Sequence, residues 1–122
     1  MKILVFGNPL IEEDNLAVKI GKVLKKDFNV FFVEKVEELL NYQNEKIIIL
    51  DVVKNIKEIT IINDIDQLKE PNLVSLHDFD LGFFLKLLKE LNMIEKIKII
   101  GLPQNMDEKK ALKEVKNILK KF

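Results

Sequence analysis

Cysteine and arginine are both missing from this sequence, and histidine, serine, threonine and tyrosine occur once each. Without cysteine the chain has no thiol nucleophile, no disulfide and no thiolate metal site. This absence is consistent with the reducing cytoplasm, where we expect the protein to be located. The lack of arginine, with 20 lysines balancing 20 acidic residues, argues against nucleic-acid binding, which normally requires a basic excess.

Long apolar runs are missing as well. No run approaches the ~20 residues that span a bilayer, and the apolar part of the N-terminus is too short for a signal peptide. A hydrophobic content of 48% is nevertheless enough for a globular core. We therefore expect one soluble domain over residues 1–122, without a membrane segment. The abundance of isoleucine, lysine and glutamate is typical of thermophile proteins and equally of low-GC mesophiles.

Short apolar segments alternate with segments of helical periodicity along the chain. The predicted strands cover residues 2–6, 28–33, 46–50, 56–62 and 97–100. The predicted helices cover about residues 15–26, 36–40, 79–91 and 107–121. The segment 56–62 follows the preceding strand too closely for a parallel crossover, so it is expected at an antiparallel edge. The pattern predicts an α/β three-layer sandwich with a mostly parallel five-stranded sheet carrying one antiparallel edge strand.

An acidic residue or the single histidine follows three of the apolar runs. Asp14 ends the segment after the first run, Asp51 directly follows residues 47–50, and His77 follows residues 73–76. If these runs are neighbouring parallel strands, their carboxyl ends share one edge of the sheet, where α/β folds usually bind ligands. Two carboxylates and one imidazole would then meet as a set suited to a transition metal with open coordination positions.

Each of these three residues also has an ordinary structural interpretation. Asp14 can cap the following helix, Asp51 can cap a loop, and a lone histidine such as His77 is often structural or simply exposed. Ser75 lies two residues before His77, but neither an oxyanion hole nor a strained nucleophile turn accompanies it, which argues against a serine hydrolase. The segment 7–14 contains one glycine, one proline and three acids, so it is unsuited to binding phosphate.

Four segments, taken in order, resemble one protein family. Residues 5–14 read as a strand, Gly-Asn, an apolar pair and an acidic pair, and residues 48–51 read as an apolar strand closed by Asp. Residues 75–77 read Ser-x-His before a Leu-rich stretch, and residues 99–103 contain a late strand closed by Gly. This order resembles the hydrogenase maturation endopeptidases, which trim the C-terminus of the nickel-containing large subunit of NiFe hydrogenases. The resemblance covers nearly the whole chain.

The resemblance implies a metal-dependent, aspartic-type endopeptidase that uses no serine or cysteine nucleophile. The family's metal-contacting carboxylates correspond to Asp14 and Asp51, and its metal-contacting histidine corresponds to His77. The same three residues are the implied catalytic residues. The implied partner is a hydrogenase large-subunit precursor, which supplies the nickel and loses its C-terminal extension. A metal acts as a Lewis acid and lowers the pKa of bound water, while a carboxylate can serve as the base.

The sequence departs from the family pattern at two places. The family usually has Gly-Asp-Asp-Gly where residues 12–15 read Glu-Glu-Asp-Asn, and the late segment reads Gly-Leu-Pro-Gln rather than Gly-Ile-Gln-Pro. Missing glycines change the backbone angles that a loop can reach. A non-catalytic homologue that binds a hydrogenase-type partner is therefore one alternative. A receiver-like signalling domain phosphorylated on Asp51 is another, although its acidic pair would have to lie directly at the end of the first strand.

Overall fold

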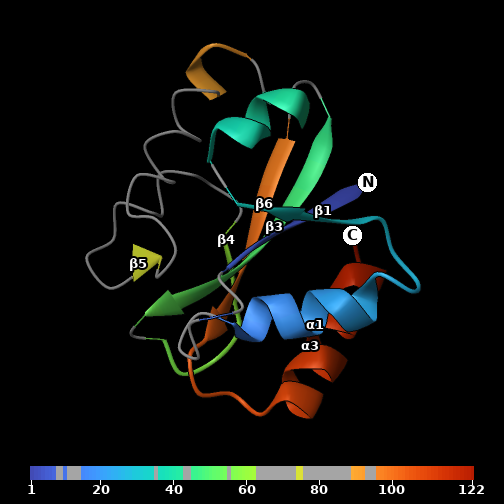
Figure 1. Cartoon of the computed structure of the whole chain (residues 1–122), viewed down its shortest axis with the longest axis vertical. Helices are drawn as coiled ribbons and strands as arrows, with labels where there is room; N and C mark the ends of the chain where they lie inside the picture. The colour runs from blue at the N-terminus through green and yellow to red at the C-terminus, as the bar shows by residue number, and fades with distance from the viewer. Residues whose placement is uncertain are drawn as a thin grey trace.

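The computed structural model describes residues 1–7, 10, 15–34, 36–42, 45–54, 56–62, 74–75, 89–92 and 96–122 (Figure 1). The elements are, in order, β1 (Lys2–Phe6), α1 (Leu16–Leu24), β2 (Val30–Val33), the 3-10 helix η2 (Val36–Tyr42), β3 (Lys46–Lys54), β4 (Thr60–Ile62), β5 (Val74–Ser75), β6 (Lys96–Pro103) and α3 (Glu108–Lys120). In this part of the chain no helix has the length and apolar character needed to cross a membrane.

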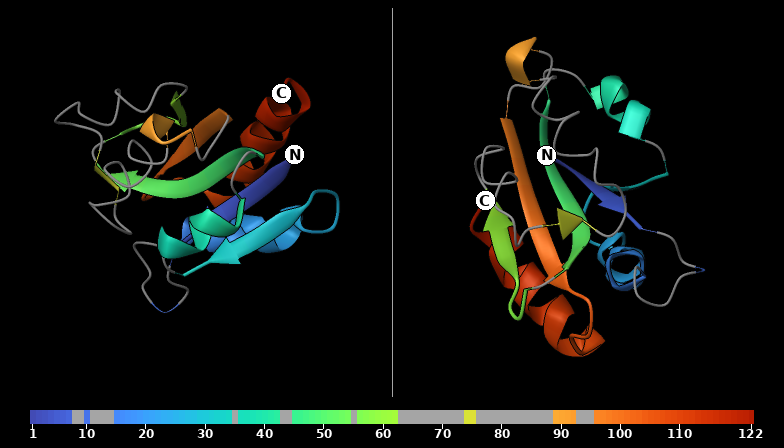
Figure 2. Two further views of the ribbon diagram at one scale, coloured as in Figure 1. Left: turned by 90° about the horizontal axis from the view of Figure 1, so that it is seen from above. Right: turned by 90° about the vertical axis from the view of Figure 1, so that its left-hand side faces the viewer.

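The strands form one sheet in the order β2-β1-β3-β6-β4, and the short strand β5 pairs with β3 off this path. β1 pairs in parallel with β2 and with β3, and β3 pairs in parallel with β6. β4 pairs antiparallel with β6 at one edge. The right-hand view in Figure 2 shows this succession from β4 through β6 and β3 to β1. The predicted α/β fold, with a mostly parallel sheet and an antiparallel edge strand, is confirmed, and the short β5 adds a second antiparallel strand that the sequence does not predict.

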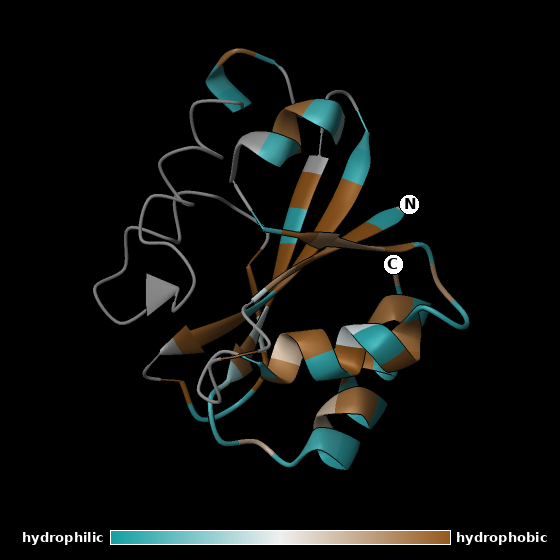
Figure 3. Cartoon of the chain, in the orientation of Figure 1, coloured by the Kyte–Doolittle hydropathy of each residue, from teal (hydrophilic) through white to brown (hydrophobic). Residues whose placement is uncertain are grey.

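The side chains of the strands divide between two cores, one on each face of the sheet, because successive residues point to opposite faces. On one face, residues such as Val5 and Leu50 pack with the apolar sides of α1 and α3. On the other face, Phe6 and Ile49 pack with Leu39 of η2. Figure 3 shows the strands as mainly hydrophobic and the two long helices as mixed. Helical elements on both faces give the three layers that the sequence predicts.

The two long helices differ in how they begin. Asp107 caps α3, because its side chain accepts a hydrogen bond from the backbone N–H of Lys110 at 3.1 Å, as the sequence predicts. Asn15 precedes α1 and makes no side-chain capping bond. α1 is shorter than predicted at its end, because the chain tightens after Leu24: the backbone N–H groups of Lys26 and Asp27 donate only three residues back, to Val23 O at 3.3 Å and Leu24 O at 3.0 Å.

The predicted ends of two central strands are wrong. β3 continues to Lys54, four residues past its predicted end, and β6 continues to Pro103. The reason is mutual pairing, since the parallel ladder between them extends as far as Val53 opposite Pro103. In the sequence, an acidic residue or a glycine after an apolar run resembles the end of a strand, and this ladder contains one of each. Asp51 and Gly101 therefore lie within strands rather than after them.

Other predictions on this part of the chain have mixed outcomes. The described residues of the apolar run 73–76, Val74 and Ser75, pair antiparallel with β3, so this run is not a parallel neighbour of the other two. The helix predicted over residues 36–40 forms as the 3-10 helix η2. The helix predicted over residues 79–91 falls mostly outside the described residues.

Candidate active site at the carboxyl edge of the sheet

Asp51 is the one charged side chain that is fully buried among the described residues, with 1% of its surface exposed. It lies in β3 at the level where β1 ends. The ladder between these strands reaches Val5 opposite Leu50, and β1 stops one residue later at Phe6. On the other side of β3, β6 continues past this level. Asp51 therefore lies at a step in the carboxyl edge of the sheet, where ligand sites of α/β folds usually form.

The carboxylate of Asp51 lies on the η2 face of the sheet. Ile49, two residues earlier, is buried in the η2 core, and side chains two apart on a strand share a face. The Oδ1 atom of Asp51 accepts a hydrogen bond from the backbone N–H of Val52 at 2.9 Å. Burying a carboxylate is costly, so a position that retains one against an apolar core is a candidate for a functional role.

Gly101 is the residue directly opposite Asp51 in the parallel register of β3 and β6. Residues paired in this way share a face, so no side chain projects from β6 beside the carboxylate. A Cβ atom at position 101 would lie 2.9 Å from Val53 Cγ2, which is closer than real Cβ contacts allow. The sequence indicates Gly101 only as a strand end. Its position beside Asp51 depends on the register, which sequence reasoning missed.

Gly7 follows β1 at this same edge, with a backbone φ of 152° that side chains rarely adopt. Glycine therefore allows the chain to leave the sheet at the Gly-Asn of the segment 5–14 that resembles the family. α1 connects β1 to the parallel strand β2, so it runs back along the sheet and begins at the carboxyl edge. Gly7, Asp51 and the start of α1 thus lie at one edge of the molecule.

The other two predicted site residues, Asp14 and His77, lie outside the described residues. Their described neighbours are Asn15, which precedes α1, and Ser75, which pairs with Val53. Where the structure is described, no group of three His, Cys, Asp or Glu side chains could hold a metal ion. The ligand set of two carboxylates and one imidazole therefore stays a prediction.

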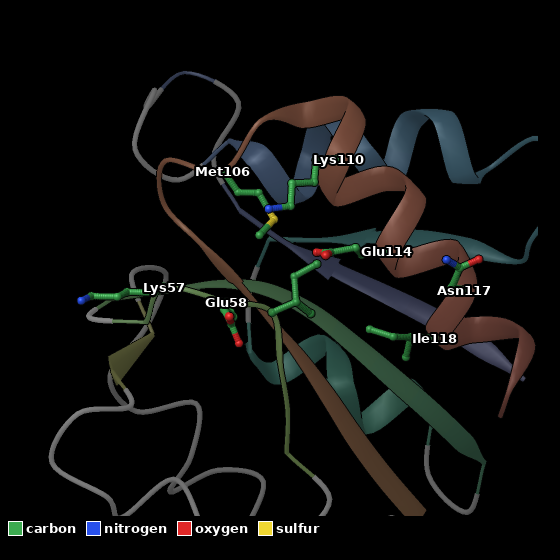
Figure 4. A pocket seen from close by; sticks show the side chains of 8 residues that line it. Lys57, Glu58, Met106, Lys110, Glu114, Asn117 and Ile118 are labelled. Carbon is green, nitrogen blue, oxygen red and sulfur yellow. The ribbon is translucent and has the colours of Figure 1, made fainter.

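A pocket of about 390 Å³ lies on the opposite side of the sheet, between α3 and the segment that leads into β4 (Figure 4). Its lining includes the apolar side chains of Ile59 and Met106 and the charged side chains of Lys57 and Glu114. α3 packs in the core of the other face, whereas Asp51 faces η2. The pocket therefore does not include the candidate site.

No protein-family model and no curated protein matches the sequence. Solved structures match its fold. The hydrogenase-maturating endopeptidase HybD from E. coli aligns with a TM-score of 0.65 at 20% identity, covering 99% of this chain and 93% of that one. For a hydrogenase 3 maturation protease the TM-score is 0.68 at 20% identity, with coverages of 94% and 86%. For the endopeptidase HycI from Escherichia coli it is 0.67 at 18% identity, with the same coverages. The chain therefore has the fold of hydrogenase maturation endopeptidases, which its sequence motifs predict.

Proposed function

We propose that this protein is a processing endopeptidase that removes the C-terminal extension from the large-subunit precursor of a NiFe hydrogenase. Two independent observations support the proposal. The sequence carries the family's four segments in order, and the solved structures with the same fold include proteins described as hydrogenase maturation endopeptidases. The precursor, with its bound nickel, is the substrate and partner, and the reaction takes place in the cytoplasm.

The burial of Asp51 is the observation that carries this proposal. A carboxylate that only capped a loop would be solvated, whereas Asp51 is 1% exposed and lies at the step where β1 has ended. The receiver-like alternative is disfavoured because the acids at residues 12–14 begin six residues beyond Phe6, whereas that fold requires an acidic pair directly at the end of the first strand. The fixed orientation given by the Val52 N–H suits a group that acts on a bound substrate.

The proposed ligand set consists of Asp14, Asp51 and His77. Chain connectivity supports the participation of Asp14, because it is bonded to Asn15 and α1 begins at the same edge as the step. The direction of β5 supports the participation of His77. Val74 lies opposite Lys54 and Ser75 lies opposite Val53, so β5 runs toward the level of Asp51 as the chain approaches His77.

Two carboxylates and a neutral imidazole are donors that nickel accepts, and three protein ligands leave positions for groups of the precursor. Asp14, Asp51 and His77 would hold the nickel of the substrate, which would supply Lewis-acid polarisation of the scissile carbonyl. The side chains of this protein orient the precursor against the edge of the sheet, and a carboxylate takes the proton from the attacking water. Because water is the attacking group in this scheme, it requires no serine or cysteine nucleophile.

The direct test incubates the purified protein with a nickel-loaded large-subunit precursor and detects the released C-terminal peptide by mass spectrometry. We expect release by the unchanged protein and none by Asp14→Asn, Asp51→Asn or His77→Gln. Asp27→Asn is the matched control, because Asp27 is exposed in the turn after α1 and should leave cleavage unchanged. Cleavage that survives Asp51→Asn would refute the proposed role of this carboxylate.

The non-catalytic alternative predicts a different result from the same mixture. A binding protein would form a complex with the precursor that analytical gel filtration detects, and no peptide would be released under any nickel load. The comparison is needed because residues 12–15 read Glu-Glu-Asp-Asn, where the family usually has Gly-Asp-Asp-Gly.

A further inference from the structure

β2 lies at one outer edge of the sheet, and among the described residues it pairs only with β1. The left-hand view in Figure 2 shows it in cyan beside β1. Its sequence is Val-Phe-Phe-Val, with neither a charge nor a proline. Soluble proteins usually protect edge strands with charged residues or proline, because an unprotected edge pairs with another chain. β2 lacks both protections.

Two large aromatic side chains on this strand are partly exposed. Phe31 is 39% exposed and Phe32 is 40% exposed, and they point to opposite faces of the sheet. The ring of Phe31 lies 5.9 Å from the ring of Tyr42 in η2, on one face. On the other face the Nζ atom of Lys25 lies 5.9 Å from the centre of the Phe32 ring. An added strand would cover apolar surface on both faces at once.

The backbone of β2 directs hydrogen-bonding groups outward. Ile3 N–H donates to Asn29 O at 2.8 Å, which shows that the backbone groups of residue 29 face β1. Because these groups alternate along a strand, those of Phe31 also face β1, and those of Val30 and Phe32 face away from the sheet. An added antiparallel strand could therefore form a regular ladder with Val30 and Phe32.

The charges on either side of β2 are of opposite sign. Residues 22–27, which lead into the strand, carry three lysines and one aspartate, whereas residues 34–38, which follow it, carry three glutamates and one lysine. When two copies of β2 pair antiparallel about Phe31, the partner subunit's Glu34 lies opposite Phe28, close to the exposed Lys26 in the turn before the strand. The rest of the two segments belongs to α1 and η2, which lie on opposite faces of the sheet. A parallel arrangement of two copies would bring like charges together. The charge pattern therefore matches a second copy of this chain in one orientation.

We propose that the protein forms a two-fold symmetric dimer through antiparallel pairing of its β2 strands. The register is centred on Phe31, which faces the partner subunit's Phe31, while Val30 faces the partner subunit's Phe32. Centring on Phe32 instead would set Val30 opposite a glutamate, Glu34, so it is disfavoured. The two sheets join into one continuous sheet, and the interface uses an edge of the molecule that the proposed cleavage site does not occupy.

The first experiment measures mass by sedimentation velocity from micromolar to near-millimolar concentration. We expect a monomer–dimer equilibrium for the unchanged protein. Phe31→Lys places two like charges opposite each other and should weaken dimerisation by about tenfold or more. Threonine, like phenylalanine, is favoured in strands but has no ring, so Phe31→Thr should weaken the dimer while the thermal unfolding curve shows a folded chain. Leu91→Lys is the matched control, because Leu91 is 58% exposed and precedes β6, which β1 and β3 separate from β2 in the sheet, so this change should leave the dimer unchanged.

A charge-exchange experiment tests the antiparallel orientation. Lys26→Glu and Glu34→Lys, made separately, should each weaken self-association, and a mixture of the two variants should regain the affinity of the unchanged protein. Recovery is expected because the mixed dimer has opposite charges at both ends. A protein that stays monomeric at the highest concentration overturns the proposal. So does a folded Phe31→Lys variant that dimerises normally, or a mixture that shows no recovery.

Discussion

Asp51 and Gly101 are direct neighbours across the parallel strands β3 and β6, and both positions face the η2 core. The pair two residues earlier, Ile49 and Ile99, fills that core with two large apolar side chains. At the next pair on this face, Asp51 and Gly101, β3 carries a carboxylate and β6 carries no side chain. The carboxylate thus borders a position without a side chain, at the level of Phe6, the last residue of β1.

The substitution Gly101→Ala tests this relationship. The new Cβ atom would lie 2.9 Å from Val53 Cγ2, so the two strands or the valine must shift. Overpacking of this kind costs about 1–3 kcal/mol of unfolding free energy, which urea denaturation measures. We also expect peptide release from the precursor to fall, because the shift occurs beside Asp51.

Gly21→Ala provides the matched control for this effect. Its Cβ atom would lie 2.9 Å from Val5 Cγ2, which is an equally close contact in α1 on the opposite face of the sheet. Stability should decrease here too, partly offset by the higher helix propensity of alanine. The folded fraction of this variant should cleave normally. Equal loss of cleavage in both glycine variants would show that general destabilisation, rather than the surroundings of Asp51, sets the activity.

Asp51→Asn separates function from stability. Asparagine keeps an Oδ1 acceptor for the Val52 N–H and removes a buried negative charge. We therefore expect the unfolding free energy to stay the same or to rise by up to about 2 kcal/mol, while peptide release is lost. Thermal unfolding by calorimetry measures the first quantity and mass spectrometry the second. A marked decrease in stability would mean that the charge of Asp51 has a structural role.

Much of the architecture could be predicted from the sequence, because the signals for it are local. The run Ile47–Leu50 is apolar and mostly β-branched, which predicts β3, and Asp107 precedes the last helical pattern as an N-cap residue, which predicts the start of α3. The antiparallel edge position of β4 follows from its short distance to β3 along the chain. These features need no knowledge of which strands are neighbours.

The surroundings of the candidate site could not be predicted in the same way, because they depend on strand register. In sequence, Asp51 and Gly101 look like the ends of their strands, since a carboxylate and a glycine are unfavourable inside a sheet. Both residues nevertheless lie inside their strands, because the parallel ladder between β3 and β6 continues past them to Val53 and Pro103. The antiparallel direction of β5 was equally hidden, because Val74 and Ser75 provide only two residues of local pattern.

A second glycine, Gly7, is required by backbone conformation rather than by packing. Its φ of 152° is strained for any residue with a side chain, so Gly7→Ala should lower the unfolding free energy by about 1–3 kcal/mol. Urea denaturation gives the value. Leu10→Ala in the same segment is the control, because Leu10 is 91% exposed and its truncation should change stability by no more than about 0.5 kcal/mol. An unchanged midpoint for Gly7→Ala would show that the chain can leave β1 with an ordinary backbone angle.

The cap of α3 gives a prediction in which stability changes and function does not. Asp107→Ala removes the acceptor for the Lys110 N–H and should cost about 1 kcal/mol, whereas Asp107→Asn keeps a capping oxygen and should cost little. α3 packs on the face of the sheet opposite Asp51, so both variants should release the peptide at the normal rate when folded. Denaturation midpoints and single-turnover cleavage are measured on the same preparations. Slower cleavage by Asp107→Ala but not by Asp107→Asn would contradict this expectation. It would mean that loss of the cap shifts the end of β6, and with it Asp51, through the β3–β6 ladder.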